Sequence, residues 1–245
     1  MKKNDEPQQV GWLVDAEFGS VIFSPPTSVK SSRSKPLSRR AIQACPAINL
    51  LENGLYEIKC PFNLSLTLES AGENFNLYFD EKFTRLDTDL LGKHIVFMPQ
   101  NQWRDSKKPV IQILLPYVFL SDEECYVNQY PPFLDDAARQ WPGYLVAGRF
   151  PCNIWPRTLN WAFEWTDPGK ELRLSRGQTL FYVKIDGTSP SREINLVRAE
   201  NTQDLKKYRK AIEATPKYMS NTFQLFDDAS AIRPKVLLKE ISNNG

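Results

Sequence analysis

The chain has 245 residues, of which 41% are hydrophobic and 24% are charged, and its formal net charge is +2. This balance predicts a folded protein with a sizeable core and excludes a wholly disordered chain, while the small net charge gives no general support for binding to nucleic acids or membranes. The longest apolar run is too short to cross a bilayer, and the charged N-terminus leads into no apolar signal segment, so we expect a cytoplasmic protein without membrane contact.

The first forty residues are expected to form a hairpin followed by a basic segment. Residues 11–15 and 20–23 are two short apolar runs of the kind that pair in a hairpin. Residues 29–40 are rich in serine and contain no acid, and their basic residues are Lys30, Arg33, Lys35, Arg39 and Arg40. Such a segment is typical of a solvated loop. The alternative is an arm that binds an acidic partner or a phosphate backbone, although no aromatic residues interleave to support nucleic acid.

Residues 41–199 have the pattern of a β-rich domain. Alternation is strictest at residues 63–69, where Leu64, Leu66 and Leu68 predict one buried strand face. Further strand-like runs follow at 55–60, 74–79, 94–98, 110–120, 144–147, 171–174, 179–185 and 193–198. Pro116 cannot donate to a ladder, so we expect a bulge, a bend or an edge there, and residues 176–178 are typical of a tight turn.

The period changes after residue 199. Leu205, Tyr208 and Ile212 share one helical face, Asn201 or Thr202 is suited to cap the helix, and Pro216 would end it. A second short helix is expected within 219–231. We therefore predict a mainly β protein, jelly-roll or β-sandwich-like, with an N-terminal hairpin and arm (1–40), a core domain (41–199) and a helical C-terminal appendage (200–245).

The tryptophan-rich run 155–165, WPRTLNWAFEW, alternates large apolar residues with small or polar ones. This alternation favours a core strand over an exposed surface for stacking bases or sugars. Arg157 is the exception on the apolar face, and a buried arginine needs a partner. We therefore expect Arg157 to hold either a ligand carboxylate or phosphate or an internal acid, and we take Arg157, Trp155 and Trp161 as candidate ligand-binding residues.

A second aromatic concentration lies at residues 126–141, YVNQYPPFLDDAARQW. Its prolines restrict their neighbours to extended conformations. The segment is suited either to line a pocket or contact surface, with Tyr130 as a candidate ligand-binding residue, or to cover its own sheet. The sequence does not separate these alternatives.

The residues that usually carry chemistry are sparse. The chain has four cysteines, none in a closely spaced pair, and a single histidine, His94. A zinc or iron site normally needs several such ligands, so we expect no metal and no cofactor. The cysteines are expected to be reduced and mostly buried, and His94 to be structural. No nucleotide-binding loop or nucleophile elbow is present, and the sequence singles out no catalytic residue.

Three stretches together resemble a loosely defined group of phage and bacterial β-rich proteins with no assigned activity. They are CPAI at 45–48, WPRTLNWAFEW at 155–165 and LSRGQTLFYV at 174–183. The resemblance covers residues 41 to 199. It implies a phage or bacterial origin, and therefore a bacterial cytoplasm for a phage protein, but it implies no mechanism and no functional residues.

Two classes of function remain. We expect a non-catalytic binding or assembly protein that acts through protein–protein contacts or self-association, because catalytic signatures are missing and a basic segment is present. The alternative is a small-molecule-binding protein or enzyme with its site in the mouth of a jelly-roll β-fold, near Arg157. Fold alone does not choose between them.

Overall fold

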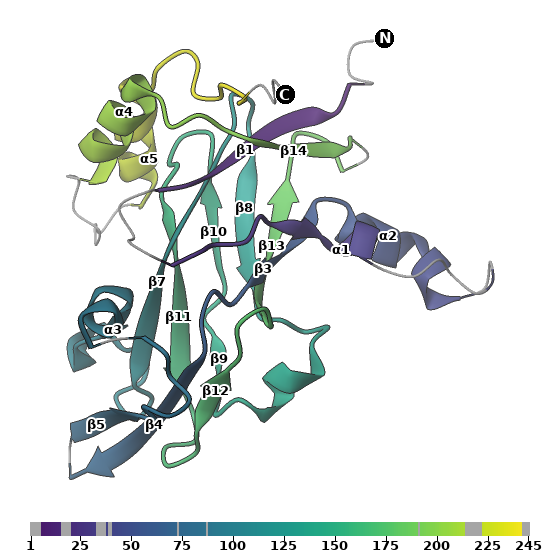
Figure 1. The fold of residues 1–245 in the computed structure, drawn as a ribbon. Helices are drawn as coiled ribbons and strands as arrows, with labels where there is room; N and C mark the ends of the chain where they lie inside the picture. Colours follow the sequence, from purple (N-terminus) through teal and green to yellow (C-terminus); the bar gives the residue numbers. More distant parts are fainter. Residues whose placement is uncertain are drawn as a thin grey trace.

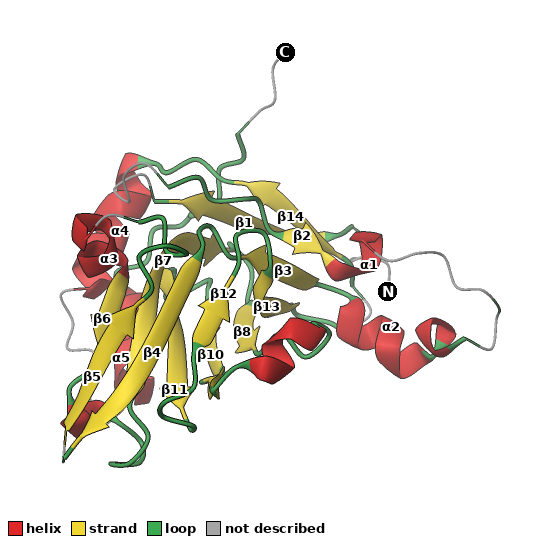
Figure 2. Cartoon of the chain, turned by 60° about the horizontal axis from the view of Figure 1, so that its bottom comes forward, coloured by secondary structure: helices red, strands yellow, loops and turns green. Residues whose placement is uncertain are grey.

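Three β-sheets surround one apolar core (Figures 1 and 2). The computed structural model of the protein describes residues 6–15, 21–32, 38, 41–72, 74–86, 88–190, 192–213 and 222–241. One of the sheets curls into a half-barrel, and two helices follow at the C-terminus. The prediction of a mainly β protein with a helical C-terminal part is confirmed.

The six-stranded sheet contains the tryptophan-rich strand. In spatial order its strands are β14 (Ile194–Arg198), β1 (Gln8–Val14), β7 (Val110–Leu120), β11 (Thr158–Trp165) and β9 (Gly143–Leu145), and β6 (Ile95–Phe97) pairs with β7. The five-stranded sheet has the order β10 (Gly148–Pro151), β8 (Tyr126–Tyr130), β13 (Thr179–Asp186), β3 (Leu55–Lys59) and β2 (Thr27–Ser28). The three-stranded sheet has the order β12 (Leu172–Leu174), β4 (Leu64–Ala71) and β5 (Asn74–Phe79).

Strand β1 corrects the predicted N-terminal hairpin. Instead of pairing with residues 20–23, it lies antiparallel to β7 and parallel to β14, with Gln8 opposite Ile194. Residues 21–23 are described but form no strand, and Ser20 lies outside the described residues. The hairpin was predicted from neighbouring residues alone, whereas the partner strands of β1 come from distant parts of the chain.

The strand predictions for the core domain are largely confirmed. Leu64, Leu66 and Leu68 are at most 1% exposed, as their alternation predicted. The pairing of β7 with β11 shifts register, with Thr158 opposite Val118 and Asn160 opposite Leu114. The extra β7 residues in this bulge include Pro116, so the expected irregularity occurs where the ladder donor is missing.

The short helices that precede residue 141 were missed. They are α1 (Val29–Ser32), α2 (Pro46–Glu52) and α3 (Thr88–His94), with short 3-10 turns η2 (Ile42–Ala44), η3 (Gln100–Gln102) and η4 (Asp136–Gln140). Each is too short to show a repeating apolar face. The start of α2 did carry a signal, because proline at the first helical position is favourable.

The C-terminal helices are α4 (Gln203–Glu213) and α5 (Thr222–Ala231). The predicted face of α4 is buried against the back of the six-stranded sheet, where Leu205 belongs to the same cluster as Val118. Thr202 accepts a hydrogen bond from the backbone N–H of Leu205, which confirms one of the two expected caps. Arg209 differs from the exposed Lys206 and Lys207, because its side chain is 7% exposed and is paired with Asp15.

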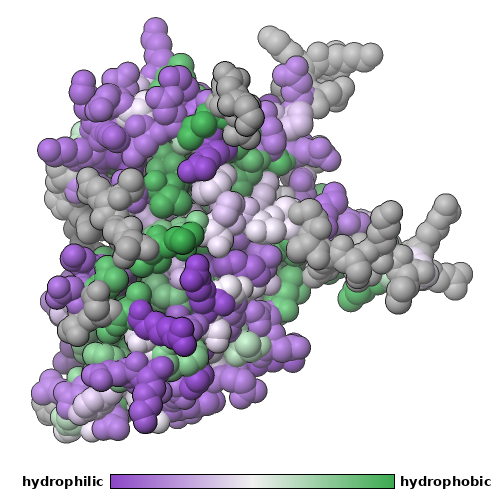
Figure 3. Space-filling view, viewed as in Figure 1, coloured by the Kyte–Doolittle hydropathy of each residue, from purple (hydrophilic) through white to green (hydrophobic). Residues whose placement is uncertain are grey.

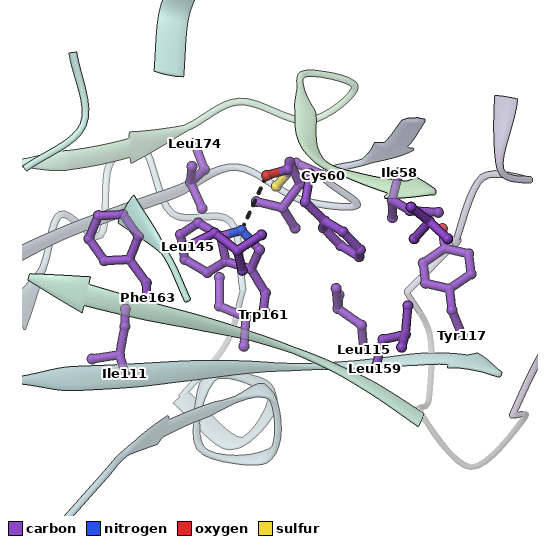
Figure 4. Close-up of a cluster of buried hydrophobic side chains, with 14 of the residues drawn as sticks. Ile58, Cys60, Ile111, Leu115, Tyr117, Leu145, Leu159, Trp161, Phe163 and Leu174 are labelled. Carbon is purple, nitrogen blue, oxygen red and sulfur yellow. Dashed lines mark hydrogen bonds between the residues drawn. The ribbon is translucent and has the colours of Figure 1, made fainter. Parts of the chain in front are cut away.

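The tryptophan-rich strand lies in the core, which confirms the favoured interpretation of its alternation. Leu159, Trp161, Phe163 and Trp165 are at most 1% exposed. Figure 4 shows Trp161 among apolar side chains from both large sheets, with its indole N–H donating to the carbonyl of Leu180 at 3.2 Å. Because β11 and β13 belong to different sheets, this bond ties the two layers together.

Candidate functional site

The four residues expected to bind a ligand do not form one site. Trp161 is fully buried and its N–H is already bonded. Trp155 is half-buried and packs edge-on against Phe226 of α5, and the Arg157 guanidinium stacks 4.8 Å from the centroid of the Trp155 ring. Tyr130 belongs to the five-stranded sheet, beside Tyr182. These residues therefore do not line a common pocket. A ligand site in the mouth of the β-fold stays a prediction.

The aromatic and proline-rich segment mostly covers its own sheets. Its first part is strand β8, and Phe133 packs on Tyr182 with ring centroids 5.1 Å apart. Trp141 packs edge-on against Trp161 at 5.6 Å. What remains open beside this segment is a small, mainly apolar hollow of about 150 Å³ next to Tyr144.

A buried carboxylate beside this hollow was missed from the sequence. The Glu164 side chain is 1% exposed and forms an ion pair with Arg104, which bonds both carboxylate oxygens. Tyr144 donates its hydroxyl to the same carboxylate at 2.5 Å. Burial alone would raise the pKa of Glu164, but hydrogen bonds from Arg104 and Tyr144 outweigh it, and the pKa lies below its usual value. The cluster is saturated with internal partners, so we assign it to stability.

The thiols and the histidine have structural environments. All four cysteines are free; Cys45 is exposed, whereas Cys60, Cys125 and Cys152 are buried. Burial raises the pKa of Cys60 to about 12 and that of Cys152 well above its usual value, so neither is an activated nucleophile at neutral pH. His94 is 1% exposed and lies between the rings of Phe23 and Phe62.

A thiol titration is expected to distinguish Cys45 from the other three. In the folded protein, only the exposed Cys45 should react rapidly with a disulfide reagent such as Ellman's reagent, because attack requires an accessible thiolate. The remaining thiols should react after denaturation. Rapid reaction of more than one thiol per chain under native conditions would contradict the burial described above.

Another candidate site is a hollow of about 440 Å³ on the outer face of the five-stranded sheet. We call it the basic hollow, and the lining residues used below are Leu50, Leu51, Asn53, Arg149, Lys184, Asp186, Arg192 and Ile194. The sheet alternates here, because Phe181, Val183 and Ile185 face the core while Lys184 and Asp186 face outward. Helix α2 supplies the apolar wall, with Leu50 54% and Leu51 37% exposed.

Cations outnumber carboxylates in the lining of the basic hollow. Asp186 bridges Arg149 at 3.0 Å and Lys184 at 3.2 Å. Lys184 also donates to the backbone carbonyl of Asn53 at 2.7 Å, and Arg192 is held by Glu123. Arg149 is the most accessible of the three cations, with a side chain 54% exposed against 14% for Lys184 and 11% for Arg192. Stacking at 4.3 Å over the Tyr126 ring holds its guanidinium in place.

The described start of the basic segment, helix α1, lies on this face of the molecule. Val29 of α1 packs with Leu55 and Tyr182, on the side of the sheet from which Lys184 also projects. Lys30 is exposed on α1. Arg33, Lys35, Arg39 and Arg40, which were predicted to bind a partner, lie outside the described residues, between α1 and α2 in the chain. Figure 1 shows both helices on the same side of the molecule.

Within the described residues, no three cysteine, histidine or acidic side chains are grouped so that they could hold a metal ion. In the same part of the chain, none of the helices has the length and apolar character needed to span a membrane. Searches against known proteins found no matching protein family and no matching curated protein.

Proposed function

We propose that the protein is a non-catalytic binding or assembly protein that holds an acidic, partly apolar segment of a protein partner in the basic hollow. The observation that carries this proposal is the combination of an accessible arginine, Arg149, with the exposed leucines of α2 around one open hollow. A carboxylate suits the planar guanidinium, which presents several donors in a fixed geometry. Apolar side chains of the same segment would cover Leu50 and Leu51.

Charge in the neighbouring sequence supports the same partner. Residues 29–40 contain basic residues and no acid, and they precede η2 and α2 in the chain. Positive charge on the same chain would attract an acidic partner and raise its association rate, more strongly at low salt. A nucleic acid would be attracted by the same charge, but the leucines of α2 favour a protein segment.

The alternative is a small anionic ligand with an apolar part. The volume of the basic hollow lies in the range of small-molecule sites, which is roughly 300–1,000 Å³. This alternative moves the ligand site of the sequence-based hypothesis from Arg157 to Arg149.

The jelly-roll or sandwich arrangement stays a prediction, and the parallel pairing of β1 with β14 is a departure from an all-antiparallel jelly roll. Phage or bacterial origin and a cytoplasmic location also stay predictions.

Reversing the charge of Arg149 tests the proposal. We expect the wild-type protein to bind a short fluorescein-labelled peptide of alternating Glu and Leu, measured by fluorescence anisotropy at two salt concentrations. Arg149→Glu should weaken binding at least about tenfold, a loss of ~1.4 kcal/mol. The substitution replaces the accessible cation with a negative charge, which repels the acidic peptide. Raising the salt concentration should weaken wild-type binding as well.

Arg139→Glu is the matched control, because Arg139 is also a surface arginine, 75% exposed, but lies on η4 away from the basic hollow. It should leave the affinity unchanged. Equal binding of a Lys and Leu peptide, or equal binding by Arg149→Glu, would overturn the proposal. A small molecule that co-purifies with the monomer and is lost in Arg149→Glu would favour the alternative.

A further inference from the structure

Strand β5 is an open sheet edge of unusual composition. It ends the three-stranded sheet, and no other strand of the described chain pairs with its free side. It spans six residues, Asn74–Phe79, and none of them is charged. The other described edge strands of four or more residues each carry an arginine, Arg198 in β14 and Arg149 in β10. Charged residues on edge strands prevent unwanted pairing, so β5 lacks the usual protection.

Apolar side chains surround this edge. Tyr78 is 50% exposed and Phe79 39% exposed. The Trp103 ring lies 5.8 Å from that of Phe75 and 5.9 Å from that of Phe97, which links β5 to strand β6. Figure 3 shows that apolar groups reach the surface as separate patches in a mostly hydrophilic exterior. Tyr78 and Phe79 therefore give this edge a partly exposed apolar surface that pairing with another strand would cover.

From this edge we infer that β5 pairs antiparallel with β5 of a second copy of this chain, so that two three-stranded sheets join into one continuous sheet. The inference goes beyond the proposed function, because β5 and α2 lie on opposite sides of the molecule in Figures 1 and 2. Two-fold pairing of identical strands is closed and self-complementary. It would also satisfy the backbone groups that β5 directs away from β4.

The faces of β5 determine which register is possible. Phe75, Leu77 and Phe79 share the face of Leu66 and Leu68, because they are opposite Ser70, Leu68 and Leu66 in the β4 pairing. A two-fold axis perpendicular to the sheet keeps these faces on the same side in both copies. Residues of one face must therefore be opposite residues of the same face.

The register centred on Leu77 pairs five of the six residues of β5 with one another and leaves Asn74 opposite Asp80 of the second copy. It places Leu77 opposite Leu77 of the second copy, Phe75 opposite Phe79, and Asn76 opposite Tyr78. Aromatic and aliphatic pairs of this kind stabilise neighbouring strands, and no like charges face each other. This self-complementarity is the reason for choosing a second copy over an unrelated strand.

Sedimentation velocity across a concentration series tests the pairing. The wild-type protein should show a monomer–dimer equilibrium, whereas Phe79→Lys should be monomeric at the same concentrations, because two lysines would be placed in the paired strands. Phe223→Lys is the matched control, since Phe223 is an exposed phenylalanine, 78% exposed, on α5. It should dimerise like the wild type. A wild-type protein that is monomeric at all concentrations, or dimers that persist in Phe79→Lys, would overturn the inference.

Cross-linking tests the register in a Cys45→Ser background, which removes the exposed thiol. Leu77→Cys should form a disulfide-linked dimer under mild oxidation by oxidised glutathione, with the two thiols supplying two electrons and two protons to the oxidant. Asn74→Cys should not, because the two residues 74 would lie roughly 20 Å apart along the paired strands. Cross-linking of Asn74→Cys and not of Leu77→Cys would contradict the register. Dimerisation and peptide binding are measured separately, so failure of one leaves the other standing.

Discussion

Replacing Trp161 with alanine is expected to lower the free energy of unfolding by about 3–5 kcal/mol, the largest effect of any single substitution considered for this protein. The side chain is fully buried and stacks on Phe163, with ring centroids 4.9 Å apart and an interplanar angle of 12°. Its removal would leave a cavity between the two large sheets and would leave the carbonyl of Leu180 without its indole donor.

Urea unfolding followed by circular dichroism measures this loss without relying on tryptophan fluorescence. Trp161→Phe should cost less than alanine, because it retains one aromatic ring and loses only the N–H donor and part of the indole volume. Trp155→Ala is the comparison at a half-buried position of the same run, and it should be milder than Trp161→Ala. A Trp161→Ala protein within about 1 kcal/mol of the wild type would contradict the central position assigned to this residue.

The second large effect concerns the buried carboxylate. Glu164→Ala should lower the free energy of unfolding at neutral pH by about 1.5–3 kcal/mol, because charged hydrogen bonds to Arg104 and Tyr144 are lost. Asp136→Asn removes a carboxylate that is 89% exposed and paired only at the surface. It should change the free energy by less than about 0.5 kcal/mol.

The contribution of Glu164 should depend on pH. The pKa of Glu164 is lower in the folded state than the ordinary value of 4.5. Protons therefore bind more readily to the unfolded state, and the stabilisation is complete above pH 4.5 and is lost as the pH falls through the folded-state pKa. The difference in unfolding free energy between the wild type and Glu164→Gln should shrink as the pH is lowered below 4.5. A difference that stays constant down to pH 2 would show that the carboxylate is not the titrating group.

The strands of the core were predictable because their signal is local. Alternation in β4 and β11 follows directly from side chains that point to opposite faces, so burial of Leu66 and Trp161 could be read from spacing. The same is true of the buried face of α4. In contrast, the pairing of β1 was predicted wrongly, because both of its partner strands lie far away in the chain.

The candidate sites depend on contacts that spacing does not encode. Arg104 and Glu164 are 60 residues apart, and the basic hollow brings Leu50 together with Arg149 and Asp186. The sequence pattern places Glu164 on the polar, solvent-facing side of a strand. In the fold, contact between a loop and this strand buries the side chain. Arg157 carried a real signal, an arginine in an apolar run, but stacking on Trp155 explains part of that signal without a ligand.

The parallel pair of β1 and β14 has a consequence for synthesis of the protein. Gln9 and Asn195, which are hydrogen-bonded across this pair, are 186 residues apart. Strand β1 leaves the ribosome first but cannot complete its side of the six-stranded sheet until β14 has emerged. During that interval one edge of β1 lacks its partner, and contacts this distant in sequence form slowly. Nascent chains arrested before residue 194 should therefore be more sensitive to proteases and chaperones than chains released after it.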